Sequence, residues 1–189
     1  MVHAVILNGS YNGSVPKGLV EVCERPILHH QLESLNRCRN IEGVIITGFS
    51  DVEDSVNFFV RRNNVHKPLY VSRPGGNSFA DSVSASIYGI DALNVGPDDR
   101  VLYILGDVPC IPPDKLDLFL GEVKNPNELV IPTVSSGKIE ELIRKVEEEF
   151  GHQEIQKNHR TYWPSSDGYW HHLNMALVPV SKLRENNEQ

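Results

Sequence analysis

Residues 2–18 read VHAVILNGSYNGSVPKG, a short apolar run that gives way to a polar loop. The run is rich in β-branched residues, which favours a buried strand over a helix. Backbone N–H groups in a loop of glycine, serine and asparagine can face an anion, and Lys17 adds a compact positive charge. A ligand-binding connection and a plain polar connector both fit this pattern. The loop matches neither GxGxxG nor GxxxxGKS/T, so neither a dinucleotide-binding fold nor a P-loop NTPase is supported.

Beyond this segment, short β-rich runs alternate with segments of helical period. The expected strands are residues 3–7, 43–47, 68–71, 100–105 and 128–134. The expected helices are residues 27–35, after Pro26, and residues 52–60, 79–93, 114–120 and 136–150. This alternation predicts a three-layer α/β/α fold with a mostly parallel, Rossmann-like sheet. Ligands bind such sheets beyond the carboxyl ends of the strands.

The pattern changes after residue 150. Residues 161–163, a turn over 164–168 and an apolar run over 169–180 predict an antiparallel hairpin that joins the sheet or caps the site beside it. We expect residues 1–183 to form a single domain. Residues 184–189 are a polar tail, which is either a frayed terminus or the edge of a truncated chain.

Composition narrows the class of protein. The chain has 189 residues and a formal net charge of −7, which argues against a nucleic-acid binder or a protein of anionic membrane surfaces. Three cysteines without a CxxC pair indicate neither a disulfide framework nor a zinc site. No apolar run approaches the ~20 residues of a membrane span, and no signal peptide is recognisable. We therefore expect a soluble cytoplasmic protein.

A second polar feature follows the strand at 100–105, where residues 105–109 read LGDVP. Asp107 comes directly after a buried strand, at the edge of the sheet where ligands bind. Its carboxylate is a suitable ligand for Mg²⁺, although Asp is also common in turns and helix caps. Position favours the metal-binding interpretation.

Taken in order, these segments resemble the MobA-like nucleotidyltransferases, which have a glycosyltransferase-A-like fold. Residues 4–10, AVILNGS, resemble the opening strand and loop of the family. VPKGLVEV at 15–22, followed by RPIL at 25–28, resembles its next segment, and LGDVP matches its GDxP motif. RTY at 160–162, DG at 167–168 and LN at 173–174 resemble a late family pattern. The resemblance covers residues 2–183.

The resemblance implies a Mg²⁺-dependent reaction in which a phosphorylated acceptor attacks the α-phosphate of a nucleoside triphosphate and pyrophosphate leaves. Lys17 and Asp107 would be catalytic, and Asp107 and Asn174 would bind the metal. The implied nucleotide-binding residues are Leu7, Asn8, Gly9, Ser10, Gly13, Arg73, Gly75, Gly76, Asn77 and Ser82. The implied acceptor-binding residues are Arg160, Asp167, His172 and Asn174. The implied partners are a nucleoside triphosphate and a small phosphorylated acceptor. Neither a nucleic acid nor a membrane is an implied partner. Whether the protein forms a homodimer is left open.

Two departures from the family pattern keep other functions open. No arginine lies between Asn8 and Pro16, where the family has a GxxxRM-type pattern, and Asn8 stands where a small residue is expected. A degenerate member that binds a nucleotide as a regulatory or interaction module is therefore the second hypothesis. A glycosyltransferase that uses a nucleotide sugar is a third, but residues 107–109 do not supply its DxD pair.

Overall fold

The computed structural model describes residues 1–9, 15–108, 111–135, 163–165, 168–172 and 174–185, and single residues or pairs between 137 and 148. The chain divides into two compact units. The first unit contains Met1–Val130 and Ala176–Gln189, and the second contains Ile131–Met175. Each unit is described by itself.

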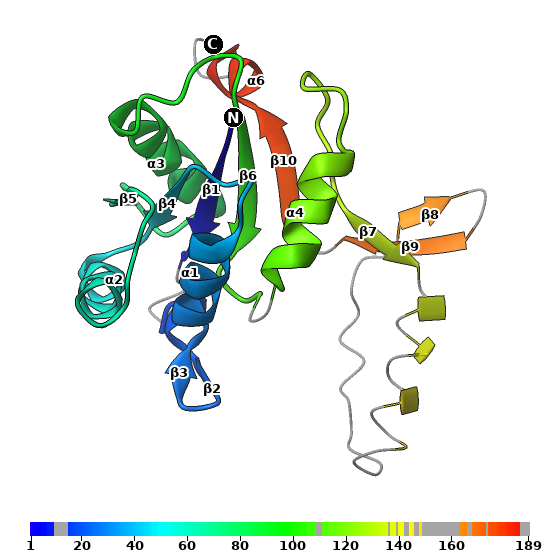
Figure 1. The fold of residues 1–189 in the computed structure, drawn as a ribbon, viewed down its shortest axis with the longest axis horizontal. Helices are drawn as coiled ribbons and strands as arrows, with labels where there is room; N and C mark the ends of the chain where they lie inside the picture. The colour runs from blue at the N-terminus through cyan, green and yellow to red at the C-terminus, as the bar shows by residue number, and fades with distance from the viewer. Residues whose placement is uncertain are drawn as a thin grey trace. The chain divides into compact units, whose positions relative to one another are not determined.

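A five-stranded sheet with the order β10-β6-β1-β4-β5 forms the centre of the first unit (Figure 1). Its strands are β1 Val2–Leu7, β4 Gly43–Thr47, β5 Leu69–Ser72, β6 Arg100–Leu105 and β10 Met175–Pro179. β1 pairs in parallel with β4 and β6, and β4 pairs in parallel with β5. β10 runs opposite to β6, because Val180, just after β10, donates its N–H to Asp99, just before β6. The predicted, mostly parallel sheet is confirmed.

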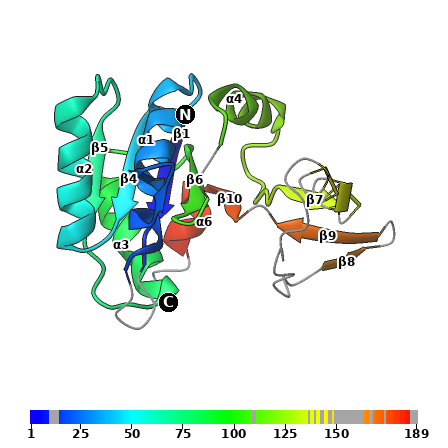
Figure 2. The ribbon, with the colours of Figure 1, turned by 90° about the horizontal axis from the view of Figure 1, so that it is seen from below.

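Helices cover both faces of this sheet. α1 Ile27–Arg37 and α4 Pro113–Glu122 lie on one face, and α3 Phe79–Ala92 and α6 Val180–Glu185 lie on the other (Figure 2). α2 Ser50–Arg62 packs beside α1. Because helices bury both faces, every residue of β1 is buried rather than every second one. The predicted α/β/α layering is confirmed.

The hydrophobic core follows the alternation of side chains along the strands. Val5 and Leu7 of β1 point toward α3 and α6, where they join a cluster with Ile90 and Val180. Ala4 and Ile6 point to the opposite face, which α1 and α4 cover. The remaining members of the cluster are Ile45, Val95, Val101 and Tyr103.

A small hairpin links the first loop to α1. The short helix η1 Lys17–Leu19 is followed by β2 Glu21–Val22 and β3 Arg25–Pro26, which pair antiparallel. Both residues of its two-residue turn, Cys23 and Glu24, have positive φ angles of 51° and 61°. Two positive φ angles are the geometry of a type I′ turn, which matches the twist of the strands. The hairpin returns the chain to the start of α1.

The predicted strand at 128–134 differs from the structure. Val130 makes an isolated antiparallel bridge with Leu177, and the strand β7 covers only Thr133–Ser135. Pro132 lies between them and has no N–H to donate to a ladder, which explains the interruption. α2 and α4 extend by a few residues beyond the predicted helices. The described residues of the predicted helix at 136–150 are helical.

The second unit contains a three-stranded sheet with the order β7-β9-β8, in which β8 is Trp163–Ser165 and β9 is Gly168–His172. The antiparallel pairing of β8 with β9 confirms the predicted hairpin. The apolar run expected at 169–180 is broken into β9 and β10 at Asn174, whose φ is 56°. Asparagine adopts this left-handed conformation more readily than most residues. Within the described part of the chain, no helix is both long enough and apolar enough to cross a membrane.

The end of α1 is tied to α4 through Cys38, which is buried. Its Sγ donates to Asp117 Oδ1 at 2.9 Å, and Asp117 also accepts from the backbone N–H groups of Arg39 and Asn40. Burial, together with the hydrogen bond to Asp117, raises the pKa of the Cys38 thiol to about 12.

These properties predict that Cys38 resists alkylation in the native protein. Iodoacetamide at pH 8 should modify exposed Cys23 and leave Cys38 unmodified, because the thiolate is the nucleophile. In denaturant, both should react. Mass spectrometry of the peptides measures each site, and equal labelling of both in the native protein would contradict the contact with Asp117.

Candidate active site

Lys17 and Asp107 meet at the carboxyl ends of β1 and β6. Lys17 Nζ donates to Asp107 Oδ2 at 2.7 Å, although the two residues are 90 positions apart. β1 and β6 are parallel neighbours, so the segments that follow them leave the sheet at the same edge. The Lys17 side chain is 55% exposed and the Asp107 side chain 31% exposed, so solvent and ligands reach the pair.

A cavity of about 190 Å³ lies at this edge. Five residues that the sequence analysis placed in the site line it, namely Leu7, Gly9, Lys17, Asn77 and Ser82. Phe79, Leu105 and Gly106 also line it and were not predicted. The volume is below the ~300–1,000 Å³ of typical ligand pockets, so the cavity suits part of a nucleotide.

The start of α3 presents hydrogen-bonding groups to this cavity. Ser78 Oγ accepts from the N–H of Asp81 at 3.0 Å, and Asp81 Oδ2 accepts from the N–H of Ser78 at 2.9 Å, which forms a capping box. The Ser78 hydroxyl also donates to Asp81 Oδ2 at 2.6 Å, and this hydrogen bond, together with the one from the Ser78 N–H, lowers the pKa of the Asp81 carboxyl. Ser82, one residue further on, is 2% exposed, and its Oγ has no partner among the described residues. Its hydroxyl is therefore available to a ligand.

Gly9 allows the first loop to pass close to Ser82. A Cβ added at Gly9 would lie 3.2 Å from Ser82 Oγ, which is tighter than an ordinary contact. A larger residue at position 9 would press on the one hydroxyl that α3 offers to the cavity.

Asn8 separates the segments that carry Lys17 and Asp107. Its side chain is completely buried, and a Cβ added at either Gly18 or Gly106 would overlap its Oδ1. Neither Oδ1 nor Nδ2 has a partner among the described residues. Asn8 is one of the predicted nucleotide-binding residues, and in the structure it is buried between Gly18 and Gly106, outside the set of residues that line the cavity. Gly18 and Gly106 were not predicted, although each is adjacent to a predicted charged residue.

The two oxygens of the Asp107 carboxylate have different surroundings. Lys17 contacts Oδ2, while Oδ1 is buried without a partner in the described part of the chain. Among the described residues, no group of three or more His, Cys, Asp or Glu side chains could hold a metal ion alone. Mg²⁺ is commonly bound by one or two carboxylates together with substrate phosphates and water. A single carboxylate at this edge fits that form of binding.

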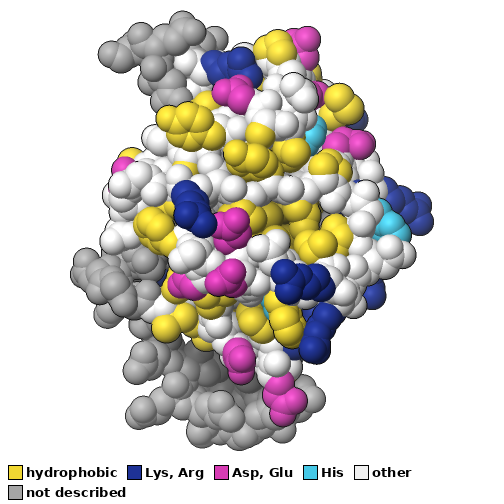
Figure 3. All heavy atoms as spheres, turned by 90° about the vertical axis from the view of Figure 1, so that its left-hand side faces the viewer, with side chains coloured by type: hydrophobic (Ala, Val, Ile, Leu, Met, Phe, Trp, Pro, Cys, Tyr) yellow, Lys and Arg dark blue, Asp and Glu magenta, His cyan; other side chains and the backbone are white. Residues whose placement is uncertain are grey.

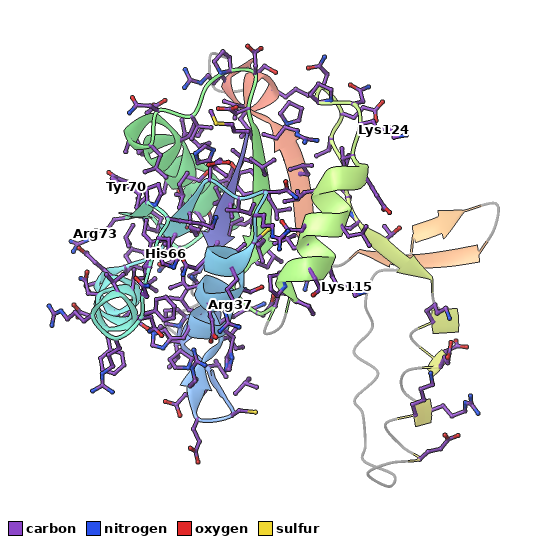
Figure 4. All side chains as sticks on the ribbon, in the orientation of Figure 1. Arg37, His66, Tyr70, Arg73, Lys115 and Lys124 are labelled. Carbon is purple, nitrogen blue, oxygen red and sulfur yellow. The ribbon has the colours of Figure 1, made fainter. Side chains whose placement is uncertain are left out.

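The loop at 73–77 is divided between the cavity and the surface. Asn77 lines the cavity, but the Arg73 guanidinium contacts Glu53 of α2 at 2.6 Å and lies on the outer side of the molecule above α2 (Figure 4). Gly75 is exposed, and a Cβ added at Gly76 would meet the Asp81 carboxylate. Arg73 therefore does not line the cavity in this structure.

The remaining predicted residues lie elsewhere or outside the described part of the chain. Ser10, Gly13, Arg160 and Asp167 are outside the described residues. His172 ends β9 in the second unit, where it pairs with Thr133 of β7, and Asn174 follows it.

The packing of Asn8 against Gly106 predicts a non-additive pair of substitutions. Gly106→Ala should lower the free energy of unfolding by about 1–3 kcal/mol, because the new methyl group overlaps Asn8 and approaches Leu7 O. Asn8→Ala in the same chain should remove part of this loss. Urea denaturation of the single and double variants measures the coupling.

Gly121→Ala is the matched control. Gly121 lies in α4, and a Cβ added there meets nothing within 4 Å. The substitution should leave stability unchanged or raise it by up to about 1 kcal/mol. Additive effects of Asn8→Ala and Gly106→Ala would contradict the packing of Asn8 against Gly106.

The fold resembles that of several solved structures. A hypothetical transferase from Thermus thermophilus is 20% identical, with a TM-score of 0.62, and the match covers 98% of this chain and 68% of that one. CMP:2-keto-3-deoxy-manno-octonic acid synthetase, solved with CTP, is 15% identical, with a TM-score of 0.64 and coverage of 99% and 77%. Francisella tularensis 2-C-methyl-D-erythritol 4-phosphate cytidylyltransferase is 15% identical, with a TM-score of 0.63 and coverage of 99% and 76%.

At these identities the likeness shows the fold. A search of curated proteins finds no sequence match. The model of the MobA-like NTP transferase domain matches residues 5–160, which confirms the resemblance noted in the sequence. The chain belongs to the MobA-like NTP transferase family.

Proposed function

We propose that the protein transfers a nucleoside monophosphate from a nucleoside triphosphate to a small phosphorylated acceptor, with Mg²⁺ bound at Asp107 and with release of pyrophosphate. Family membership and the structural neighbours indicate a nucleotidyltransferase. The observation that carries the finer proposal is the 2.7 Å contact between Lys17 and Asp107 beside the cavity. It brings one cation and one metal-binding group together where parallel sheets bind their ligands.

The reaction needs positioning and charge neutralisation more than a strong base. An oxygen of the acceptor phosphate forms the new bond to the α-phosphorus, and the bond to the bridging oxygen of pyrophosphate breaks with its electron pair. The attacking oxygen is already anionic. The Lys17 ammonium offsets the negative charge that develops on the α-phosphate oxygens. Bound Mg²⁺ would neutralise triphosphate oxygens.

Other groups at the cavity can orient the nucleotide. The Ser82 hydroxyl offers a hydrogen bond to an anionic or sugar oxygen. Gly9 keeps the first loop close to this position. These groups bind and orient the donor, whereas Lys17 and Asp107 act on the reacting phosphates.

The proposed partners are small substrates, and the proposed location is the cytoplasm. Two structural neighbours are named for CTP or for cytidylyl transfer, so CTP is the first donor to test. Acidic and basic side chains are interspersed over the face that carries α2, β5 and α3 (Figure 3), where α2 has Asp51 and Glu53 in its first turn and Arg61 and Arg62 in its last. Mixed charge of this kind, with a net charge of −7, suits small substrates in the cytoplasm better than a polyanion.

A second candidate is a nucleotide-binding module without turnover. No arginine lies between Asn8 and Pro16, and Lys17 is the one cation among the described residues that line the cavity. A module of this kind would bind a triphosphate but would not release pyrophosphate.

The first experiment is a thermal-shift panel of ATP, GTP, CTP and UTP, each with Mg²⁺ and with EDTA. Ligand at a hundredfold excess over its Kd adds about 2.7 kcal/mol to the stability of the folded state. We expect one nucleotide, CTP in the first instance, to raise the Tm only with Mg²⁺. If no nucleotide raises the Tm under either condition, neither the transferase nor the nucleotide-binding module is supported.

The second experiment measures pyrophosphate release with CTP and 2-C-methyl-D-erythritol 4-phosphate, and then with other phosphorylated polyols and sugars. Lys17→Ala and Asp107→Asn should each lower kcat/KM by roughly 10²–10³ or more, because each removes charge stabilisation of the transition state. Lys115→Ala and Asp114→Asn are matched controls, since they make the same changes at an exposed pair on α4 (Figure 4). Full activity of Asp107→Asn would contradict the mechanism.

A further inference from the structure

We propose that Gln31 of α1 is a positioning residue that holds the turn carrying Asp107 in place for cation binding. The inference rests on the proposed function, because it assigns a purpose to the geometry of Asp107. Gln31 does not contact the cavity and belongs to no motif noted in the sequence.

The side-chain amide of Gln31 hydrogen-bonds to both ends of the turn. Its Nε2 donates to the carbonyl oxygens of Leu105 and Val108, each at 2.9 Å. These two residues flank Gly106 and Asp107. One amide group therefore fixes the turn from both sides.

Two backbone hydrogen bonds complete the attachment of the turn. The N–H of Val108 donates to Leu105 O at 3.2 Å, which closes the turn, and the N–H of Gly106 donates to Leu7 O at 3.0 Å, which fixes it to β1. β6 ends at Leu105, so these bonds and the Gln31 amide take over where the β1–β6 ladder stops. Val108 O accepts from Gln31 beyond the last residue of the strand.

The apolar side chains around Gln31 indicate that the role of its amide is to hydrogen-bond to the turn. Gln31 is 1% exposed, and most buried residues of α1 are apolar, including Leu28, Leu32 and Leu35. Its Oε1 has no partner among the described residues, which is unfavourable for a buried oxygen. An apolar side chain would avoid this cost but would lose both donors to the turn.

The position of the turn determines whether Asp107 can serve two partners. Asp107 Oδ2 contacts Lys17, whereas Oδ1 is buried without a partner among the described residues, so the orientation of the turn decides whether this oxygen can be presented to a cation. Displacements of about 0.5 Å or 10–20° are enough to impair such a site. Removal of the Gln31 donors would release the turn and weaken cation binding without touching either charged group.

A matched control distinguishes the positioning role of Gln31 from a purely structural one. Asn36 is also an amide on α1 that makes two hydrogen bonds to backbone groups, donating to Asn64 O at 2.9 Å and accepting from the N–H of His66 at 2.9 Å. Asn36→Leu removes the same kind of interaction far along the chain from Asp107. Gln31→Met keeps the length of the side chain and removes both donors.

The test compares Gln31→Met, Asn36→Leu and Asp107→Asn with the unsubstituted protein. Two quantities are measured, namely the affinity for Mn²⁺, with and without CTP, and the rate of native-state hydrogen exchange at the Val108 amide. We expect Gln31→Met to weaken Mn²⁺ binding about 10–100-fold, as substitutions behind a metal ligand do. It should also speed exchange at Val108, whereas Asn36→Leu should change neither quantity.

The outcomes distinguish a failure of the Gln31 role from a failure of the metal site at Asp107. If Asp107→Asn weakens Mn²⁺ binding but Gln31→Met does not, the role of Gln31 is wrong and the proposed function stands. If Asp107→Asn leaves Mn²⁺ binding unchanged, the metal site itself is wrong. Equal loss in Asn36→Leu and Gln31→Met would indicate a general structural effect. Gln31→Leu replaces Gln31→Met if the latter does not fold, with the same expected results.

Discussion

β1 and β6 pair in parallel from Val2 opposite Arg100 to Leu7 opposite Leu105, so both strands end at the same level of the sheet. The contact between Lys17 and Asp107 depends on that register. The loop after β1 delivers Lys17, and the turn after β6 delivers Asp107, to within 2.7 Å of each other. Parallel strands require long connections, and these connections supply α1 and α3, which cover opposite faces of the sheet. A slip by one residue would exchange the side chains that face α1 and α4 with those that face α3 and α6, and both sets are buried.

The Lys17–Asp107 pair is supported by groups that lie outside it. Asn8 occupies the space between the Lys17 and Asp107 segments, and this space exists because Gly18 and Gly106 carry no side chain. Gln31 holds the turn from the side of α1. Buried amides cost free energy when their hydrogen bonds are incomplete, as those of Asn8 and Gln31 are among the described residues. The buried amides of Asn8 and Gln31 therefore reduce stability, but they fix the positions of the segments that carry Lys17 and Asp107.

The sequence predicts those parts of the structure that depend on local pattern. Alternating runs predict the α/β/α layers, and the location of Lys17 and Asp107 after buried strands predicts that they share an edge. It does not predict Gln31, because helical periodicity places this residue on the buried face without indicating which carbonyl groups lie opposite. The strand expected at 128–134 is only partly present, because Pro132, which has no N–H to donate, lies between the bridge at Val130 and β7. Arg73 follows β5 as expected, but its partner Glu53 belongs to α2, and no local pattern encodes that contact.

The charge balance of the site bears on how a triphosphate would bind. The chain carries a net charge of −7, and the Asp107 carboxylate already engages the Lys17 ammonium, so their charges offset each other. A triphosphate carries several negative charges and would meet little net positive charge from the described residues that line the cavity. A divalent cation bound with the nucleotide would change this balance, because it would neutralise phosphate oxygens and would be attracted by the Asp107 carboxylate. The Lys17 ammonium, still within reach of Asp107 Oδ2, would then interact less strongly with the carboxylate and more strongly with the α-phosphate. In the proposed reaction, Asp107 would hold a metal that offsets the negative charge of the triphosphate, and Lys17 would interact with the α-phosphate.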